Sequence, residues 1–510
     1  MLAPVVSVSA QDQPPEAAAL WDDFNHYVLI ARPDLAGAAG AQLLAQVDDA
    51  AMLDIVEASD YTNFEQVLQR AARIESLAQT ANSLSRRIQA ARIERSREPA
   101  RIRADIQTLA AGRRANINAT ERLRAAGQYA APHLLATLLD EDQASLHPYV
   151  LAAMVAMGRP MVYPLSVALP NLEPAPMGQV AQVLGEIGYP MALPYLKQVL
   201  EDGSTDPSAR VIVRAAFDQV IQSVDVSPAI SAARLFMLLG ENQYAAGTAG
   251  DELPGYDRVS DKGQVWVYER KVGLIPVPVP GAIFGDVQAM RSARQALALE
   301  PSMDQAFSLW LMANLRRENR LPAGEADPSY PTNLLPAAFY AKLAGHLRLH
   351  DVLARALADH DAKLARDAIA ALQDTVGTEG LVTQAGSSQP LIDALSYPDR
   401  RVRYEAAFAL TNARPDAPFT ASHRVVPILA EAVRQHTTRH ALVIADDAGA
   451  TNRLQAALKD LGYQTIGGSS LSELADELDT GTGFDLIVAS LSAPGIDALY
   501  RRSADHDKLA

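Results

Sequence analysis

Two adjacent carboxylates, Asp446 and Asp447, follow directly after the apolar run Ala441–Ala445. A short apolar run bounded in this way is typical of a buried strand. Acidic side chains at the end of a strand could hold a divalent cation, because Mg²⁺ prefers carboxylate oxygens. The plainer interpretation is a pair of solvated acids, and the sequence favours it. We therefore expect no metal site, with Asp446 and Asp447 as weak candidates.

The elements around these acids alternate between strand and helix over residues 439–510. After the first strand, the pattern predicts an amphipathic helix over Thr451–Leu461, a strand over Tyr463–Ile466, a helix over Ser472–Leu478 and a strand over Phe484–Ala489. Such alternation predicts a parallel sheet with helices outside it.

The phrase ALVIADD, which ends at Asp447, and the phrase DLIVASLSAPG, which begins at Asp485, resemble the first and third strands of a response-regulator receiver domain. The resemblance implies that the acidic pair binds Mg²⁺ and that an Asp ending the third strand accepts a phosphoryl group. The aligned residue here is Ser490, whose hydroxyl cannot form an acyl phosphate. The chain stops at Ala510, before the fourth and fifth strands of such a domain. We expect a partial pseudo-receiver in a sequence that is cut short, with Ser490 at the degenerate phosphoacceptor position.

Other candidate chemistry is sparse. His346 with His350, and His436 with His440, have the i, i+4 spacing that can hold a metal on a helix, but no third ligand of the H-E-x-x-H type accompanies them. We interpret all four as histidines on helix faces. The sequence contains no P-loop, no G-x-S-x-G and no G-x-G-x-x-G. We therefore expect no enzymatic activity and no cofactor; an enzyme built from scattered polar residues has no feature in its favour.

Composition narrows the class of protein further. A chain of 510 residues with 49% hydrophobic and 21% charged residues is a folded protein of about three or four domain-sized units, or a repeat array. The net charge of −15 repels phosphate backbones, so we expect no nucleic-acid partner. The chain has no cysteine, which excludes disulfides and thiolate chemistry. No apolar run is long enough to span a membrane.

The N-terminal residues 1–17 bear on where the protein resides. Val8, Ser9 and Ala10 have the small-residue pattern of a signal-peptide cleavage site, although a basic stretch before them is missing. The alternative is a disordered tail. The sequence weakly favours an exported protein, periplasmic or on the cell surface, over a cytoplasmic one.

Residues 62–98 show the spacing of a long helix with a narrow apolar seam. Val67, Ile74, Ala81 and Ile88 recur every seven residues, and Pro99 ends or kinks the helix. A hairpin with residues 100–125 and an intermolecular coiled coil are equally compatible with this seam. The arginine-rich stretch 86–103 is interpreted as a solvated helix face rather than a patch for an acidic partner.

A repeat begins near residue 115. Its glycines, Gly127, Gly158 and Gly188, lie about 30 residues apart, and each precedes an internal proline: Pro132, Pro164 and Pro194. This predicts a helix ending at Gly and a second helix with Pro in its first turn. The segments resemble HEAT repeats, whose helix pairs stack on one another because none can bury its apolar face alone.

The same pattern returns near the C-terminal side. In residues 396–410, Asp399, Val402, Arg403, Ala406, Ala407 and Leu410 resemble the HEAT phrase D-x-x-V-R-x-x-A-A-x-x-L, and residues 361–372 are a weaker copy. The small Ala pair lets neighbouring helices approach closely. The resemblance implies a ladder of Asp and Arg between repeats.

The intervening residues differ from both arrays. Residues 296–310 resemble the junction between two TPR repeats. Val265–Tyr268 and Leu274–Val279 are predicted to pair as a two-stranded insertion, and Pro276, Pro278 and Pro280 confine the second strand to an edge.

These patterns predict a mostly α protein: an α-solenoid of HEAT/TPR-like helix pairs, with a small β-hairpin insertion and a partial α/β receiver-like segment. The expected organisation is a tail, an N-terminal helical region, HEAT-like repeats, a TPR-like repeat with the insertion and a linker, further HEAT-like repeats and the pseudo-receiver, over residues 1–17, 18–114, 115–227, 228–333, 334–438 and 439–510. The expected function is a non-catalytic scaffold for an unidentified protein partner. The alternative is a signalling protein whose receiver-like domain regulates the repeats.

Overall fold

The structure is a computed structural model of the chain. It describes residues 15–248, 253–375, 389–413, 419–434, 439–445, 447–470, 472–474 and 484–491. Helices predominate, and two small sheets accompany them, as the sequence predicts. The described residues belong to two compact units: the first lies within Met1–Leu235 and Ala249–Gly281, and the second within Phe236–Thr248 and Ala282–Ala510.

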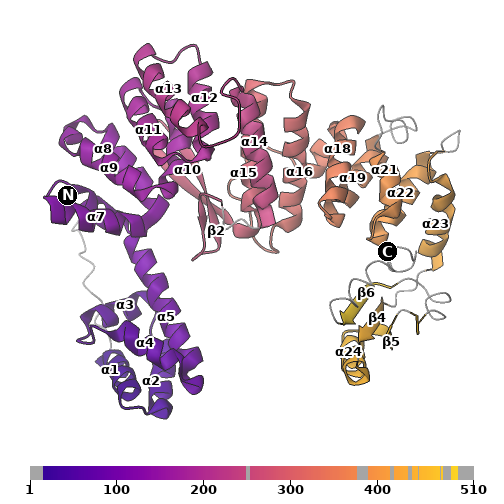
Figure 1. Cartoon of the computed structure of the whole chain (residues 1–510), viewed down its shortest axis with the longest axis horizontal. Helices are drawn as coiled ribbons and strands as arrows, with labels where there is room; N and C mark the ends of the chain where they lie inside the picture. The colour runs from indigo at the N-terminus through magenta and orange to yellow at the C-terminus, as the bar shows by residue number, and fades with distance from the viewer. Residues whose placement is uncertain are drawn as a thin grey trace, which may run out of the picture. The chain divides into compact units, whose positions relative to one another are not determined.

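The first unit begins with five helices around one core (Figure 1): α1 Pro15–Leu29, α2 Pro33–Gln46, α3 Asp49–Ala58, α4 Phe64–Ala72 and α5 Glu75–Ser96. The residues expected in one long helix are divided between α4 and α5, which meet at Arg73 and Ile74. The apolar seam of α5 is buried, but its partners are α2, α3 and α4. Of the two partners proposed from the sequence, residues 100–125 do contact α5, through the helix α7 Arg113–Ala126. The signal-peptide remnant expected over 1–17 lies outside the described residues, except for the start of α1.

The next eight helices of the first unit form two series, in which each helix contacts the next but one along the chain. They are α6 Pro99–Thr108, α7 Arg113–Ala126, α8 Ala131–Leu139, α9 His147–Met157, α10 Arg159–Ala168, α11 Pro174–Ile187, α12 Leu193–Glu201 and α13 Pro207–Ile221. Helix α7 contacts α9, α9 contacts α11 and α11 contacts α13; in the other series α8 contacts α10 and α10 contacts α12. Between the series, α9 contacts α8 and α10, α11 contacts α10, and α13 contacts α12, so the helices form an array.

The repeated glycines end helices as the sequence predicts. Gly127, Gly158 and Gly188 follow α7, α9 and α11 with positive φ, a conformation that glycine adopts without a Cβ penalty. Pro132 and Pro194 lie in the first turn of their helices. Pro164 does not: it lies inside α10, whose first turn carries Pro160 instead.

A three-stranded antiparallel sheet packs on α8 and α10 within the first unit. Its order is β1 (Tyr256–Asp257), β2 (Lys262–Glu269) and β3 (Gly273–Pro280), which confirms the predicted hairpin and the edge position of its second strand. Pro276, Pro278 and Pro280 occupy alternate positions of β3, those whose amide would face away from β2. Trp266 of β2 is fully buried, and its indole N–H donates to Gln128 Oε1 at 2.9 Å.

An ion pair also holds this sheet to the helices. Arg97 donates two hydrogen bonds to the carboxylate of Asp257, both of 2.8 Å, and its guanidinium lies over the ring of Tyr129. The Ser260 hydroxyl and the Val259 amide donate to the same carboxylate, at 2.6 and 3.1 Å. Asp257 is therefore buried but surrounded by donors.

The second unit is also built of helices: α14 Ala232–Ala245, α15 Gly281–Leu299, α16 Asp304–Arg320, α17 Ala337–Leu343, α18 His346–Ala358, α19 Ala362–Thr375, α21 Pro390–Asp393, α22 Arg400–Ala413 and α23 Val425–Arg434. Contacts pass from α16 to α18, from α18 to α19, from α19 to α22 and from α22 to α23. Ala406 and Ala407 of α22 are completely buried, as the HEAT-like phrase predicts. Arg403 donates to the carbonyls of Tyr397 and Pro398, and the carboxylate of Asp399 caps α22 through the amides of Arg401 and Val402.

A polar cluster is buried between α14, α15 and α16. Asp286 of α15 is completely buried and accepts a 2.6 Å hydrogen bond from Nε of Arg316, whose guanidinium lies 3.3 Å from the ring centroid of Tyr244. Arg320 approaches the other carboxylate oxygen of Asp286 at 3.5 Å. Asp286 and Arg316 are thus buried together, and Arg320 reaches them from a partly exposed position.

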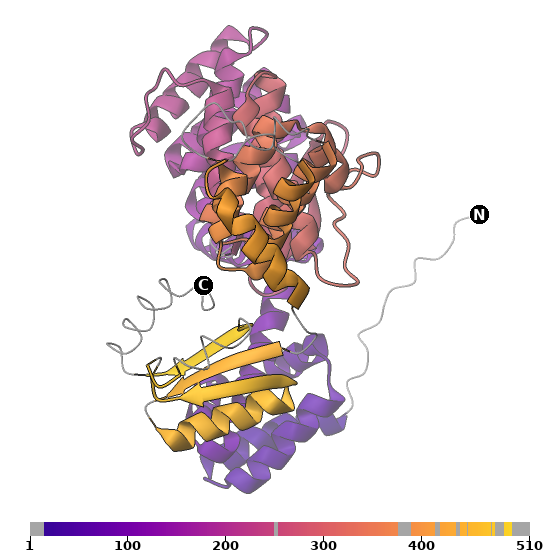
Figure 2. The ribbon, with the colours of Figure 1, turned by 90° about the vertical axis from the view of Figure 1, so that its right-hand side faces the viewer.

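The C-terminal strands form a parallel sheet of order β5-β4-β6: β4 is Arg439–Ala445, β5 Tyr463–Gly468 and β6 Leu486–Ser490. Helix α24, Ala448–Asp460, covers one face of this sheet (Figure 2). Ala441, Val443 and Leu458 are buried together on that face. Leu442 and Ile444 point to the opposite face and pack on Leu474. The helix predicted over Ser472–Leu478 lies mostly outside the described residues, and its first three residues form a turn.

None of the described helices is both long enough and apolar enough to cross a membrane.

Candidate functional site

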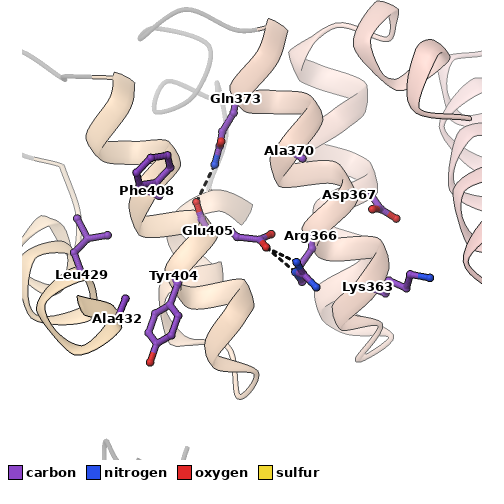
Figure 3. Close-up of a pocket in the computed structure, with 10 residues that line it drawn as sticks. All are labelled: Lys363, Arg366, Asp367, Ala370, Gln373, Tyr404, Glu405, Phe408, Leu429 and Ala432. Carbon is purple, nitrogen blue, oxygen red and sulfur yellow. Dashed lines mark hydrogen bonds and ion pairs between the residues drawn. The ribbon is translucent and has the colours of Figure 1, made fainter. Parts of the chain in front are cut away.

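A groove of about 660 Å³ lies between α19, α22 and α23 (Figure 3). Its lining residues follow helical spacing on α19, which contributes Lys363, Arg366, Asp367, Ala370 and Gln373. The opposite face of the same helix is the buried one, with Leu364, Ala368, Ile369 and Leu372 in the core. Helix α19 therefore shows its polar side to the groove and its apolar side to the array.

The far side of the groove is mainly apolar. Phe408 of α22, together with Leu429 and Ala432 of α23, lines that side. The ring of Phe408 is 54% exposed although its neighbours Ala406 and Ala407 are buried, so it belongs to the groove and not to the core. An exposed aromatic ring in a concave surface provides an anchor for a partner, because burying it removes apolar area from water.

Ion pairs and hydrogen bonds fix the polar side. Arg366 donates from Nε to Glu405 Oε1 at 2.7 Å, and the Gln373 amide donates to the backbone carbonyl of Glu405 at 3.1 Å. The hydrogen bond to Glu405 raises the pKa of Arg366. These contacts connect α19 to α22 across the groove and hold its width (Figure 3).

Two further groups at this site have shifted pKa values. Burial raises the pKa of Asp367, whose carboxylate accepts a 2.6 Å hydrogen bond from the Asn319 amide. Burial also raises the pKa of the Tyr404 phenol, and its hydrogen bond to Glu431 Oε1 at 2.8 Å acts in the same direction. Tyr404 therefore contributes a phenol that donates a hydrogen bond to Glu431.

The residues singled out from the sequence lie at the carboxyl ends of the parallel strands. Ser490 ends β6 and is in register with Ala445, the last residue of β4. Asp447 caps α24: its carboxylate accepts hydrogen bonds from the amides of Gly449 and Ala450, which lower its pKa. Asp446 lies outside the described residues. The strands therefore bring Ser490 and Asp447 to one edge of the sheet, where the Asp447 carboxylate is engaged by backbone amides.

The first histidine pair lies on one helix, as predicted. His346 begins α18 and His350 is buried on the same helix. His440 lies in β4, with Nε2 at 3.1 Å from Gln464 Oε1, so its predicted place on a helix is wrong; His436 is outside the described residues. Among the residues that the structure describes, no three His, Cys, Asp or Glu side chains gather as a metal site would require.

No protein-family model, no curated protein and no solved structure matches this chain. Its function is therefore argued from its own geometry.

The groove did not emerge from the sequence. One signal could have indicated it: Phe408 stands on the solvent side of the phrase EAAFAL, where the helical spacing of Val402, Ala406 and Leu410 leaves no place for a core residue. An aromatic residue in that position is costly in water unless a ligand or neighbour covers it.

Proposed function

We propose that this protein is a non-catalytic scaffold for protein–protein interaction, and that the groove between α19, α22 and α23 receives a segment of the partner. The single observation that carries the proposal is the exposed ring of Phe408 in a concave surface whose polar side is fixed by the Arg366–Glu405 ion pair. A preformed surface binds with less loss of side-chain entropy than a mobile one.

The contact pattern of the helices supports an α-solenoid of HEAT-like and TPR-like pairs. In such an array each pair contacts its neighbours along the chain, and one series of helices lines the concave face. The two series α7–α9–α11–α13 and α8–α10–α12 have this neighbour relation within the first unit. The junction between α15 and α16, at residues 300–303, coincides with the TPR-like boundary predicted from the sequence.

The expected partner is a protein rather than a nucleic acid, since the chain carries a net charge of −15. The groove combines an apolar wall with hydrogen-bonding groups, which suits a peptide segment with an apolar anchor side chain. We retain export as part of the proposal, on the small-residue pattern at residues 8–10.

Site-specific photo-crosslinking tests this proposal. The benzophenone variant Phe408→p-benzoylphenylalanine, in cells that produce the protein, should yield one dominant adduct with another protein. Adding Ala370→Arg, which fills the groove from an exposed position, should remove the adduct. Val211→Arg, at a 71% exposed site on α13, should leave it unchanged. An adduct pattern that is the same with and without Ala370→Arg would contradict the groove as the binding surface.

The alternative, a signalling protein regulated through a receiver-like domain, is favoured by one observation. The order β5-β4-β6, with the second strand beside the first and the third on its other side, is how a flavodoxin-like doubly wound sheet starts. A serine at the end of β6 argues against phosphorylation there. We expect no phosphate adduct by intact-mass analysis after incubation with acetyl phosphate and Mg²⁺; a base-labile adduct on Asp446 or Asp447 would favour the alternative.

A further inference from the structure

A second concave site lies wholly within the second unit, apart from the groove. It has a volume of about 340 Å³ and is formed by the end of α15, by α16 and by the start of α17, together with the segment before α17. Most of its wall is apolar, from Leu297, Phe307, Trp310, Pro331, Leu334 and Tyr340. Ligand pockets in proteins commonly measure about 300–1,000 Å³, so this one fits a small molecule with a single ring or a branched chain.

The aromatic wall is held in place by its own contacts. The rings of Trp310 and Tyr340 meet edge to face with centroids 5.0 Å apart, and the ring of Phe307 lies 6.1 Å from that of Trp310. The Tyr340 hydroxyl accepts a hydrogen bond from the Leu335 amide at 3.2 Å. The walls from α16, α17 and the preceding segment are therefore positioned before any ligand enters.

One charged group of this pocket is free to pair with a ligand. Trp310 contributes its ring and not its N–H, because the indole nitrogen is fully buried. Arg294 lines the same pocket, is exposed, and has no ion-pair or hydrogen-bond partner in the described part of the chain.

The other nearby cation is already committed. Arg348 lies over the ring of Phe307 at 4.9 Å and pairs with Asp304 at 2.6 Å. Of the residues that line the pocket, Arg294 alone is charged, so the complementary ligand has an apolar body and one negative charge. A carboxylate matches the fork of an arginine better than other small anionic groups of low charge.

We propose that this pocket binds a small apolar carboxylate, an aryl or branched-alkyl acid whose ring or chain packs on Trp310 and Tyr340 and whose carboxylate pairs with Arg294. This pocket shares no residue with the groove between α19, α22 and α23. The protein would therefore bind a small molecule in addition to its proposed protein partner.

Isothermal titration of the full-length chain with 3-phenylpropionate tests the inference, with the uncharged 3-phenylpropanamide as the matched ligand. We expect saturable binding of the acid, and binding of the amide that is weaker by about five- to tenfold, the usual worth of one partly exposed charged pair. Arg294→Gln should weaken the acid to the level of the amide. Lys342→Gln is the matched control. It removes one positive charge from α17, where Lys342 forms an exposed ion pair with Asp374 of α19, and it should leave the affinity unchanged.

Tyr340→Ala removes part of the wall and should weaken the acid and the amide alike; its fold is checked by circular dichroism. Three results would overturn the proposal: no saturable binding of the acid at millimolar concentration, equal affinity for acid and amide, or equal loss in the Arg294→Gln and Lys342→Gln variants. Binding only of a peptide that ends in a free apolar residue, and not of the small acid, would also overturn it, because the pocket would then belong to a protein partner.

Discussion

Asp257 in the first unit and Asp286 in the second are both buried beside an arginine, yet their pKa values shift in opposite directions. Burial acts to raise the pKa of each. At Asp257 the hydrogen bonds from Arg97 and Ser260 outweigh burial, and the pKa falls below its ordinary value of 3.8. At Asp286 burial prevails over Arg316 and Arg320, and the pKa rises to about 6.

Both carboxylates have a cation beside them, so the difference lies in burial and in donors: Asp286 is the more deeply buried, at 0% exposure against 5%, and it has fewer donors. Asp257 has a bidentate arginine, a hydroxyl and an amide within 3.1 Å. Asp286 has one short hydrogen bond, from Arg316, and a longer contact from Arg320. A buried carboxylate stays ionised readily only when most of its lone pairs are occupied, because each donor replaces a lost water.

The largest loss of stability is expected from Arg316→Met. This variant leaves the buried Asp286 with only the longer contact to Arg320. Removing one partner of a buried pair costs about 3–5 kcal/mol. Hydrogen exchange of α15 and α16 amides, read by mass spectrometry, should show this loss of protection. The double variant Asp286→Leu/Arg316→Met should recover most of it, since an apolar pair replaces an uncompensated charge. Failure of the double variant to recover would mean that Arg316 acts by its stacking on Tyr244 instead.

Arg97→Met should cost less, about 1.5–3 kcal/mol, because Ser260, the Val259 amide and the Tyr129 hydroxyl still donate to Asp257. The loss should be confined to β1, β2 and the helices they contact, and exchange of α15 should not change. If Arg97→Met lowered the free energy of unfolding as much as Arg316→Met, the proposed difference between the Asp257 and Asp286 sites would be refuted.

The two sites should also respond to pH in opposite senses. Between about pH 4 and 6 the folded second unit holds a proton on Asp286 that the unfolded chain has released, so raising the pH favours unfolding. Asp257 has a lowered pKa, so its contribution is present above about pH 3.8 and is lost as the pH falls through its folded value. After correction for intrinsic exchange rates, protection of α15 should fall by about tenfold or more from pH 4 to 7 while that of β2 does not. Asp286→Asn should abolish the fall.

The smallest effect is expected from Ser260→Ala. It removes one of the donors to Asp257 and should cost about 1 kcal/mol. This variant also tests the pKa of Asp257. With one donor fewer, that pKa should be less depressed, and the acid-induced unfolding of the first unit should move to higher pH. Ser204→Ala, at an exposed serine that also donates to a carboxylate, is the matched control and should leave that transition in place. An unchanged acid transition in Ser260→Ala would refute donor number as the cause of the difference.

Much of the fold could be predicted because its signals are local. Gly127, Gly158 and Gly188 end helices for a backbone reason, and the prolines of β3 mark an edge because they lack an amide hydrogen. Predictions that rest only on the spacing of residues are less accurate. The seven-residue spacing continues unbroken through Ile74, but the helix breaks there, and tertiary packing on α2 and α3 decides which helices cover the seam. Pro164 was assigned to a first turn that Pro160 occupies.

The candidate sites were harder to foresee, since they depend on residues far apart in the sequence. The groove combines Arg366 with Glu405 and Phe408 with Leu429, and no local pattern joins these pairs. The aromatic pocket needs Arg294, Trp310 and Tyr340 from three helices. By contrast, the strand ends of the C-terminal sheet could be inferred, because parallel strands always bring their carboxyl ends to one edge. The receiver resemblance placed Ser490 at the end of the third strand, and Ser490 ends β6.

The three prolines of β3 have a consequence for how molecules of this protein meet in solution. A passing strand can extend a sheet only by exchanging hydrogen bonds in both directions with its outer edge. Pro276, Pro278 and Pro280 leave the carbonyls of that edge free to accept but give it almost no amide with which to donate. An incoming strand would bury its own carbonyls without hydrogen-bond donors. The prolines therefore prevent β3 from pairing with a strand of a second molecule. A high concentration of the protein should not start fibril formation at this edge.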